Sequence, residues 1–209
     1  MMTGRAMSAR ADWRAGALAL ALSGGMLAAA IPYPARAAAP DAVAGRAKAQ
    51  ACFACHGENG IAVVPGVPHL AAQPAPAIQY QLVQFREKYR SGGGMEVMAA
   101  GLSDQDLRDI AAYFTALPAP TRREGDAQKI AHGQRVSQAS YCQSCHGAQL
   151  QGQKHVPRIA GQAADYVAVQ LRNLRSGSRV DMDGNMASAV KGLSDEDIDA
   201  LTAFAGAMQ

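Results

Sequence analysis

The pentapeptide C-x-x-C-H occurs twice in this chain, as CFACH at residues 52–56 and as CQSCH at residues 142–146. It is the attachment motif of c-type haem, in which two thiols form thioether bonds to the porphyrin and the histidine binds the iron. The chain has 4 cysteines, and the two motifs use all of them. The sequence therefore predicts two covalently bound haem c groups. The predicted thioether residues are Cys52, Cys55, Cys142 and Cys145, and the predicted proximal iron ligands are His56 and His146.

The two motifs belong to two copies of a longer repeat. The segment GLSDQD at residues 101–106 matches GLSDED at residues 192–197, and Pro68 matches Pro157. The offset between the copies stays between 89 and 91 residues. Self-similarity of this kind indicates a tandem duplication, so we expect each copy to be one folding unit with one haem. The expected divisions are residues 41–117 for the first domain, 118–126 for the linker and 127–209 for the second domain.

Helical periodicity dominates both copies. Residues 77–89 carry Ile78, Leu82 and Phe85 at the i, i+4 and i+7 spacing of an amphipathic helix. Ser103 is expected to begin the last helix of the first copy, because its hydroxyl can accept hydrogen bonds from the free amides of the first turn. No stretch alternates like a β-strand, so the sequence predicts an all-α protein. Further helices are expected at residues 42–51, 127–139 and 163–175 and after Ser194.

A second iron ligand has to come from outside the pentapeptide in each copy. The remaining histidines do not repeat, whereas Met95 and Met186 do, at 39 and 40 residues after the motif histidine. A thioether on a loop just before the last helix suits low-spin haem iron and raises its reduction potential relative to more basic ligands. The alternative for any methionine is core packing. The rival ligands Met98 and Met182 have no counterpart in the other copy.

Two other groups of residues are candidates for contact with the haem surroundings. The repeated prolines Pro68 and Pro157 lie eleven or twelve residues after the motif histidine. A prolyl carbonyl there can accept a hydrogen bond from the ring N–H of the proximal histidine and fix its orientation; an ordinary turn proline is the alternative. Several arginines either meet haem propionates or lie on solvated helix faces: Arg86, Arg90, Arg172, Arg175 and Arg179.

The first 37 residues have the pattern of a cleavable export signal. A basic front with three arginines is followed by an uncharged apolar run at residues 15–31 and by Ala-Arg-Ala at residues 35–37. A retained membrane anchor is the alternative, but the run is at the short limit for a membrane span. Because haem is joined to C-x-x-C-H outside the bacterial cytoplasm, the signal and the motif both predict a periplasmic protein. Cleavage after residue 37 would move the formal charge from +3 to zero, and nothing suggests nucleic-acid binding.

Other chemistry has to be weighed for the cysteines. Two C-x-x-C pairs form one Cys₄ zinc site in many proteins, and single pairs form redox dithiols or disulfides. Zinc does not require the adjacent histidine, the repeated methionine or the duplication. A redox dithiol is typical of a strand–helix unit, which the sequence does not predict. A disulfide across two residues closes too short a loop to stabilise a fold.

Taken together, residues 41–209 resemble the dihaem class I cytochromes c of the cytochrome c4 type. The resemblance implies two cytochrome c domains packed about a pseudo-twofold axis, with the haems near one another and joined through their propionates. It also implies histidine and methionine ligation in both halves. The chain departs from the family pattern at Ala72, which replaces the glycine kept as Gly161, and in the glycine run at residues 92–94. The resemblance rests on both C-x-x-C-H motifs, the Leu-Ser-Asp-x-Asp helix starts, Pro68, Pro157, Gln73, Gln162, Met95 and Met186.

These features predict an electron carrier and not an enzyme, because filled axial positions leave no open site for oxygen or peroxide. Similar proteins pass electrons from a quinol-oxidising complex to a terminal oxidase. The alternative is a cytochrome subunit of a periplasmic dehydrogenase that oxidises sulfide or an alcohol. A dihaem peroxidase would require one haem to lack its methionine. The expected partners are redox proteins, with peripheral membrane association left open.

Overall fold

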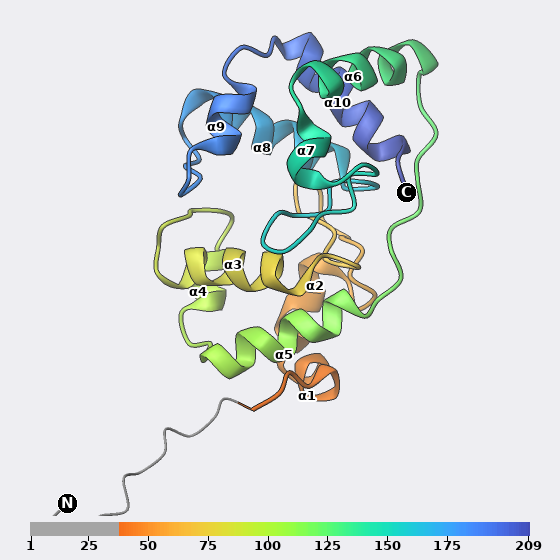
Figure 1. Cartoon of the computed structure of the whole chain (residues 1–209). Helices are drawn as coiled ribbons and strands as arrows, with labels where there is room; N and C mark the ends of the chain where they lie inside the picture. The colour runs from red at the N-terminus through yellow and green to blue at the C-terminus, as the bar shows by residue number, and fades with distance from the viewer. Residues whose placement is uncertain (1–37) are drawn as a thin grey trace, which may run out of the picture. The chain divides into compact units, whose positions relative to one another are not determined.

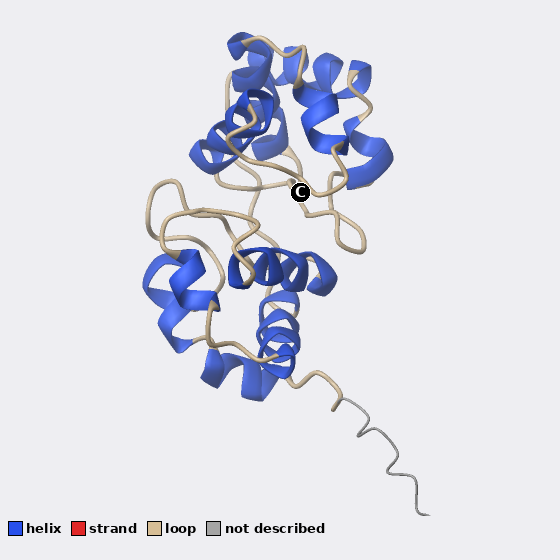
Figure 2. Ribbon diagram, turned by 90° about the vertical axis from the view of Figure 1, so that its left-hand side faces the viewer, coloured by secondary structure: helices blue, strands red, loops and turns tan. Residues whose placement is uncertain are grey.

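Helices make up both copies of the repeat in the computed structural model, which describes residues 38–209 (Figures 1 and 2). In this range the only extended pairing is an isolated bridge between Gln153 and Val156, so the all-α prediction is confirmed. The predicted export signal lies outside the described residues. The first copy contains α1 (Ala42–Lys48), the 3₁₀ turn η1 (Gln50–Cys52), α2 (Phe53–His56), α3 (Ala75–Arg86), α4 (Met95–Ala99) and α5 (Asp104–Thr115). The second contains α6 (Ala127–Ala139), α7 (Cys142–His146), α8 (Ala164–Ser176), α9 (Asn185–Val190) and α10 (Asp195–Ala207).

The predicted helices differ from the observed ones mainly at their ends. Helix α3 begins before the predicted residue 77, because Pro74 caps it and Pro76 occupies its first turn, where no amide donor is needed. It ends before residue 89, where Lys88 adopts a left-handed conformation with φ 61°. Met95 and Met186, expected on loops, lie instead in the short helices α4 and α9. The carboxylate of Asp181 stabilises α9 by accepting hydrogen bonds from the amides of Met186 and Ala187.

The first and last helices of each copy cross at a glycine. A Cβ atom on Gly45 of α1 would lie 1.9 Å from the carbonyl oxygen of Asp109 in α5, and one on Gly133 of α6 would lie 2.0 Å from that of Ala200 in α10. The two helix backbones therefore approach more closely than any side chain allows (Figure 1). This contact fixes the angle at which the helix preceding each C-x-x-C-H motif meets the last helix.

Two glutamines join the copies by reciprocal hydrogen bonds to backbone. Gln73 donates through Nε2 to the carbonyl of Arg158 at 2.8 Å and accepts from the Arg158 amide at 2.9 Å. Gln162 donates to the carbonyl of His69 at 2.9 Å and accepts from the His69 amide at 2.6 Å. Both glutamine side chains are buried. The loops after α2 and α7 therefore meet between the two groups of helices, and both copies belong to one compact unit, residues 37–209.

The last helix of each copy begins with a capping box. Ser103 accepts from the amide of Asp106, whose carboxylate accepts from the amide of Ser103, and Ser194 and Asp197 repeat the arrangement. Lys48 of α1 adds an ion pair of 2.7 Å to Asp106. Hydrogen bonds from Lys48 and Ser103 lower the pKa of Asp106 from 3.8 to about 2.

Among the described residues, no helix combines the length and the apolar character that a membrane crossing requires.

We expect Gly133→Ala to lower the free energy of unfolding by about 1–3 kcal/mol, because the added methyl overlaps the Ala200 carbonyl and the helices must separate. Gly192→Ala is the matched control, since a Cβ there meets nothing within 4 Å. Guanidinium chloride unfolding of the two purified variants measures the difference. Equal midpoints would show that the helix crossing tolerates a side chain.

We expect Asp106→Asn to lower the free energy of unfolding by about 1 kcal/mol at pH 7. The folded-state pKa of Asp106 lies below its ordinary value, so this stabilisation is complete above about pH 4 and is lost as the pH falls through about 2. The unfolding curves of wild type and variant should therefore differ at pH 7 and approach one another near pH 2. Asp104→Asn, which removes only an exposed ion pair with Arg86, should change little at either pH.

Candidate functional site

The two C-x-x-C-H segments each form one helical turn. Cys52 ends the turn η1 and Cys55 lies in α2, whereas Cys142 and Cys145 both lie in α7. The three-residue spacing brings both thiols of a pair to the same side of the helical turn. All four thiols are free; Cys52 and Cys142 are half-buried, whereas Cys55 and Cys145 are exposed. Burial raises the pKa of Cys52 and of Cys142. Each cysteine pair therefore has one half-buried and one exposed thiol on the same side of the helical turn.

The motif histidines are buried and point a ring nitrogen at a prolyl carbonyl. Nδ1 of His56 lies 3.0 Å from the oxygen of Pro68, and Nδ1 of His146 lies 2.7 Å from the oxygen of Pro157. A carbonyl only accepts, so Nδ1 carries the proton and donates it. The lone pair then resides on Nε2, which is the atom left free to bind a metal. Burial lowers the pKa of both histidines, which keeps them neutral near pH 7.

The four candidate methionines differ in how exposed their side chains are. Met95 is partly buried and packs against the core cluster of the first copy, which includes Leu107 and Phe114. Met186 is also partly buried. Met98 and Met182 are 44% and 63% exposed. The repeated pair therefore lies closer to the interior than the rivals considered from sequence.

The cysteine pairs do not meet in a zinc site. Within residues 38–209 no group of three or more histidine, cysteine or acidic side chains converges on one point. The geometry that a Cys₄ zinc centre needs is therefore not formed by the two motifs.

Two arginines between the copies form hydrogen bonds to uncharged side chains and no ion pair with the described residues. Arg90, buried and stacked 4.7 Å over the Phe85 ring, donates to Gln81, Tyr166 and Gln170. Arg179 donates to Gln170 and Gln81. The Nε atoms of both arginines are buried without a hydrogen-bond partner in the described structure. A buried guanidinium requires an anion, so this arrangement fits a negatively charged group that lies between the copies.

The other arginines considered from sequence form exposed ion pairs. Arg86 pairs with Asp104, and Arg172 and Arg175 pair with Asp199 and Asp195. These three therefore lie on solvated helix faces, in contrast to Arg90 and Arg179.

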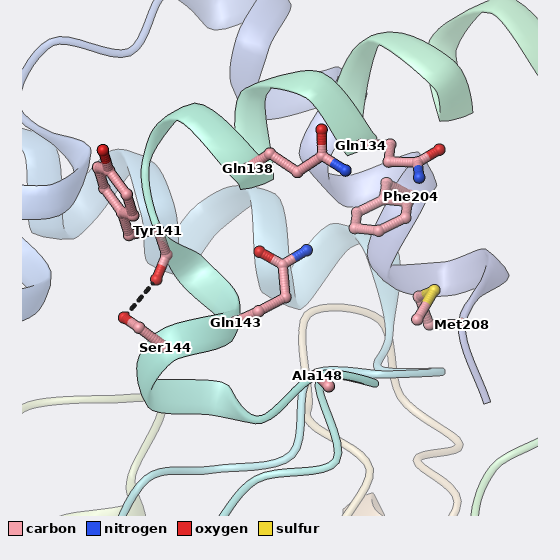
Figure 3. Close-up of a pocket in the computed structure, with 8 residues that line it drawn as sticks. All are labelled: Gln134, Gln138, Tyr141, Gln143, Ser144, Ala148, Phe204 and Met208. Atoms are coloured by element: carbon pink, nitrogen blue, oxygen red, sulfur yellow. Dashed lines mark hydrogen bonds between the residues drawn. The ribbon is translucent and has the colours of Figure 1, made fainter.

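A hollow lies beside α7 in the second copy. Figure 3 shows Gln143, Phe204 and Met208 around it, and neither His146 nor Met186 is among its lining residues. The first copy also has a hollow at the end of its last helix, lined in part by Tyr113 and Leu117, the counterparts of Phe204 and Met208. Phe53, the counterpart of Gln143, packs 5.8 Å from the ring of Tyr113 and 6.4 Å from that of Phe114.

Comparisons with known proteins agree with this geometry. The family model for cytochrome c matches residues 42–118 and again residues 130–207. The chain is 35% identical over 187 residues to cytochrome c4 of Azotobacter vinelandii, covering 80% of this chain and 89% of the relative. This chain belongs to the cytochrome c family and is of the dihaem c4 type.

Two further relatives show the range of the c4-type group. The crystal structure of reduced recombinant cytochrome c4 from Pseudomonas stutzeri superposes with a TM-score of 0.76 at 30% identity, covering 82% of this chain and 100% of that one. A thiosulfate dehydrogenase electron acceptor of Stutzerimonas stutzeri is 32% identical over 168 residues, covering 75% of this chain and 78% of the relative. Family membership shows that the chain is an electron-transfer protein with two haem c groups.

The residues of the structure fit two haem c groups. The paired thiols at Cys52 and Cys55, and those at Cys142 and Cys145, can each hold one porphyrin covalently. Arg90 and Arg179, which form no ion pair with the described residues and each have a buried Nε without a partner there, suit the carboxylates that a haem carries. When bound, each haem supplies an iron that gains and loses one electron.

The sequence predicts the motif residues but not how the copies are joined. Gln73 and Gln162 belong to the family pattern, and their repetition in both copies is the signal that points to the junction. Arg90 and Arg179 could not be separated from the solvated arginines, because burial depends on which helix faces the other copy.

Proposed function

We propose that this cytochrome is a periplasmic carrier that takes electrons from a quinol-oxidising complex and delivers them towards a terminal oxidase. In this proposal His56 and Met95 bind the first iron, and His146 and Met186 bind the second. Both axial positions are filled, so neither haem binds a substrate. The protein exchanges electrons with partners and performs no other chemistry.

The observation that carries the proposal is the protonation state imposed on each motif histidine. The hydrogen bond from Nδ1 to the carbonyl of Pro68 or Pro157 leaves Nε2 without a proton and in a fixed orientation, so its lone pair can bind iron. A ligand with fixed orientation changes little between oxidation states, which favours rapid electron transfer. The partly buried positions of Met95 and Met186 support them as second ligands over the exposed Met98 and Met182.

The surrounding residues have supporting roles. The prolyl carbonyls hold the two imidazole rings, and the tight helix crossings at Gly45 and Gly133 keep the motif turns in place. Arg90 and Arg179 balance negative charge between the copies. Burial of the histidines, each 5% exposed, keeps water away from the metal side of the ring.

Substitution of the methionines tests the ligands. We expect Met95→Ala and Met186→Ala each to abolish about half of the weak long-wavelength absorption band that marks methionine bound to Fe(III), because one of two thioethers is lost. Met98→Ala and Met182→Ala are the controls and should keep the whole band. An unchanged band in Met95→Ala would remove Met95 from the ligand set. A band that is half-sized in the wild type would favour the peroxidase alternative.

The periplasmic location rests on the signal-like pattern of residues 1–37 together with the two haem motifs. Intact-mass measurement of the protein from the periplasmic fraction of its own host tests it. The expected product lacks the first 37 residues or a few more and carries the mass of two haems. A full-length product in the membrane fraction would contradict cleavage.

A role as the electron acceptor of a periplasmic dehydrogenase is the second candidate, because a relative at 32% identity has that function for thiosulfate dehydrogenase. Stopped-flow mixing of the oxidised cytochrome with a purified quinol-oxidising complex, and separately with a thiosulfate dehydrogenase and thiosulfate, distinguishes the two. We expect reduction by the quinol-oxidising complex to be at least tenfold faster. Faster reduction by the dehydrogenase, or stable co-purification with one, would favour the second candidate.

A further inference from the structure

Two guanidinium groups lie side by side at the junction between the copies. Oε1 of Gln170 accepts a hydrogen bond from Arg90 at 3.0 Å and one from Arg179 at 2.7 Å. Oε1 of Gln81 also accepts from both arginines. Like charges that share the same two oxygen atoms repel one another, and the repulsion is poorly screened away from bulk water. The pair of arginines therefore requires a negative charge close by.

The carboxylates of the described residues do not supply this charge. Within residues 38–209 the ion pairs of arginine involve other arginines than Arg90 and Arg179. Two acidic side chains on neighbouring segments are used by backbone amides instead. Asp165 accepts from the amides of Gly66 and Tyr166, and Asp181 accepts from two amides of α9. The anion has to come from a bound group.

Tyr166 brings a further donor to the two arginines. It is half-buried in the first turn of α8, and its hydroxyl oxygen accepts from Arg90 at 3.1 Å. The hydroxyl still has its own proton to donate, and no acceptor for it occurs within residues 38–209. Burial raises the pKa of Tyr166, but the charges of Arg90 and Arg179 outweigh this effect and hold the pKa below its ordinary value. A phenol of this kind is a strong hydrogen-bond donor.

The groups of this cluster that remain unused are donors. The oxygens of Gln81 and Gln170 each accept two hydrogen bonds, whereas their amide nitrogens meet no acceptor among the described residues. The Nε atoms of Arg90 and Arg179 have no partner there either. Groups that only donate select a ligand that only accepts, and an ionised carboxylate is such a ligand.

Both arginines lie beside the segments that lead to the repeated methionines. Arg90 stacks 4.7 Å over the ring of Phe85, and a Cβ atom on Gly92, in the turn before α4, would lie 3.2 Å from that ring. Burial lowers the pKa of Arg179, and Asp181, at the start of α9, is close enough to oppose this effect. Each arginine is therefore close to the segment that carries the proposed methionine ligand of its own copy.

We infer that Tyr166 is a positioning residue whose hydroxyl donates a hydrogen bond to a haem carboxylate that Arg90 and Arg179 hold at the junction. The two haem c groups supply ligands of this chemistry, one haem in each copy, and each copy contributes one arginine and one glutamine to receive them. Tyr166 is the unmatched member, because Ala77 stands at its position in the first copy. The inference rests on the proposed methionine ligation, which brings each haem towards the arginine of its copy.

Resonance Raman spectroscopy of the reduced holoprotein tests this inference, because the bending bands of the haem carboxylate side chains shift when a hydrogen bond to them is lost. We expect a shift in Tyr166→Phe, which removes only the hydroxyl oxygen, and a larger shift in Arg90→Gln. Tyr89→Phe is the matched control and should keep the wild-type bands, since Tyr89 is 64% exposed. Wild-type bands in Tyr166→Phe would overturn the inference.

The pH dependence of the reduction potentials gives a second measurement. Loss of a donor to the ionised carboxylate raises the pKa of that carboxylate. In Tyr166→Phe we therefore expect the pH-dependent part of the potentials to move upward by about one pH unit, a tenfold change in the ionisation equilibrium. A role of Tyr166 in packing alone would leave this profile in place, and so would Tyr89→Phe.

An anion from solution is the other source of negative charge for this site. Titration of the wild type in chloride and in phosphate at equal ionic strength distinguishes the two sources. We expect equal reduction potentials in both salts, because the haem carboxylates already occupy the site. Potentials that follow the phosphate concentration would overturn the inference.

The same samples separate this inference from the proposed function. A wild type without the methionine absorption band would show that the proposed ligation is wrong. A wild type with the full band, together with unshifted carboxylate bands in Tyr166→Phe, would show that only the role of Tyr166 is wrong. If Arg90→Gln fails to fold, Tyr166→Phe decides, because it keeps the aromatic ring.

Discussion

The structure depends on hydrogen bonds that connect each copy to the histidine environment of the other. Gln73 of the first copy holds the backbone of Arg158, next to the proline that orients His146. Gln162 of the second copy holds the backbone of His69, next to the proline that orients His56. The two haem-binding loops are therefore secured across the junction as well as by their own domains. Displacement of one copy would disturb the prolyl carbonyl that orients the motif histidine of the other.

Because Gln73 and Gln162 bind backbone groups, the side chains of the two copies can differ in sequence without loss of the fold. The features that must be kept are backbone contacts, the glycines at the helix crossings and the two amide side chains at the junction. Positions outside this set have changed, as at Phe53 and Gln143, where the first copy has an aromatic ring packed against Tyr113 and the second has a glutamine. Duplication has thus left two sites of the same geometry with different side chains around them.

The arginines at the junction between the copies fall into two groups. Arg90 and Arg179 occupy equivalent positions and are held by Gln81 and Gln170 from both copies. Arg158 and His69 occupy equivalent positions and differ in their surroundings: one guanidinium nitrogen of Arg158 is buried without a partner among the described residues, whereas His69 lies near Arg123 and Asp165.

Features that depend on neighbouring residues can be predicted from the sequence without the structure. The C-x-x-C-H turns, the helix starts at Ser103 and Ser194 and the helix at residues 127–139 depend on neighbouring residues, and duplication shows which of them recur. The ends of α3 were less accurately predicted, since the prolines in its first turn and the left-handed Lys88 decide them. Which arginines are buried and what Gln73 and Gln162 contact cannot be predicted from the spacing of residues in the chain. These properties depend on surfaces from distant parts of the chain meeting one another, and no spacing within one copy contains that information.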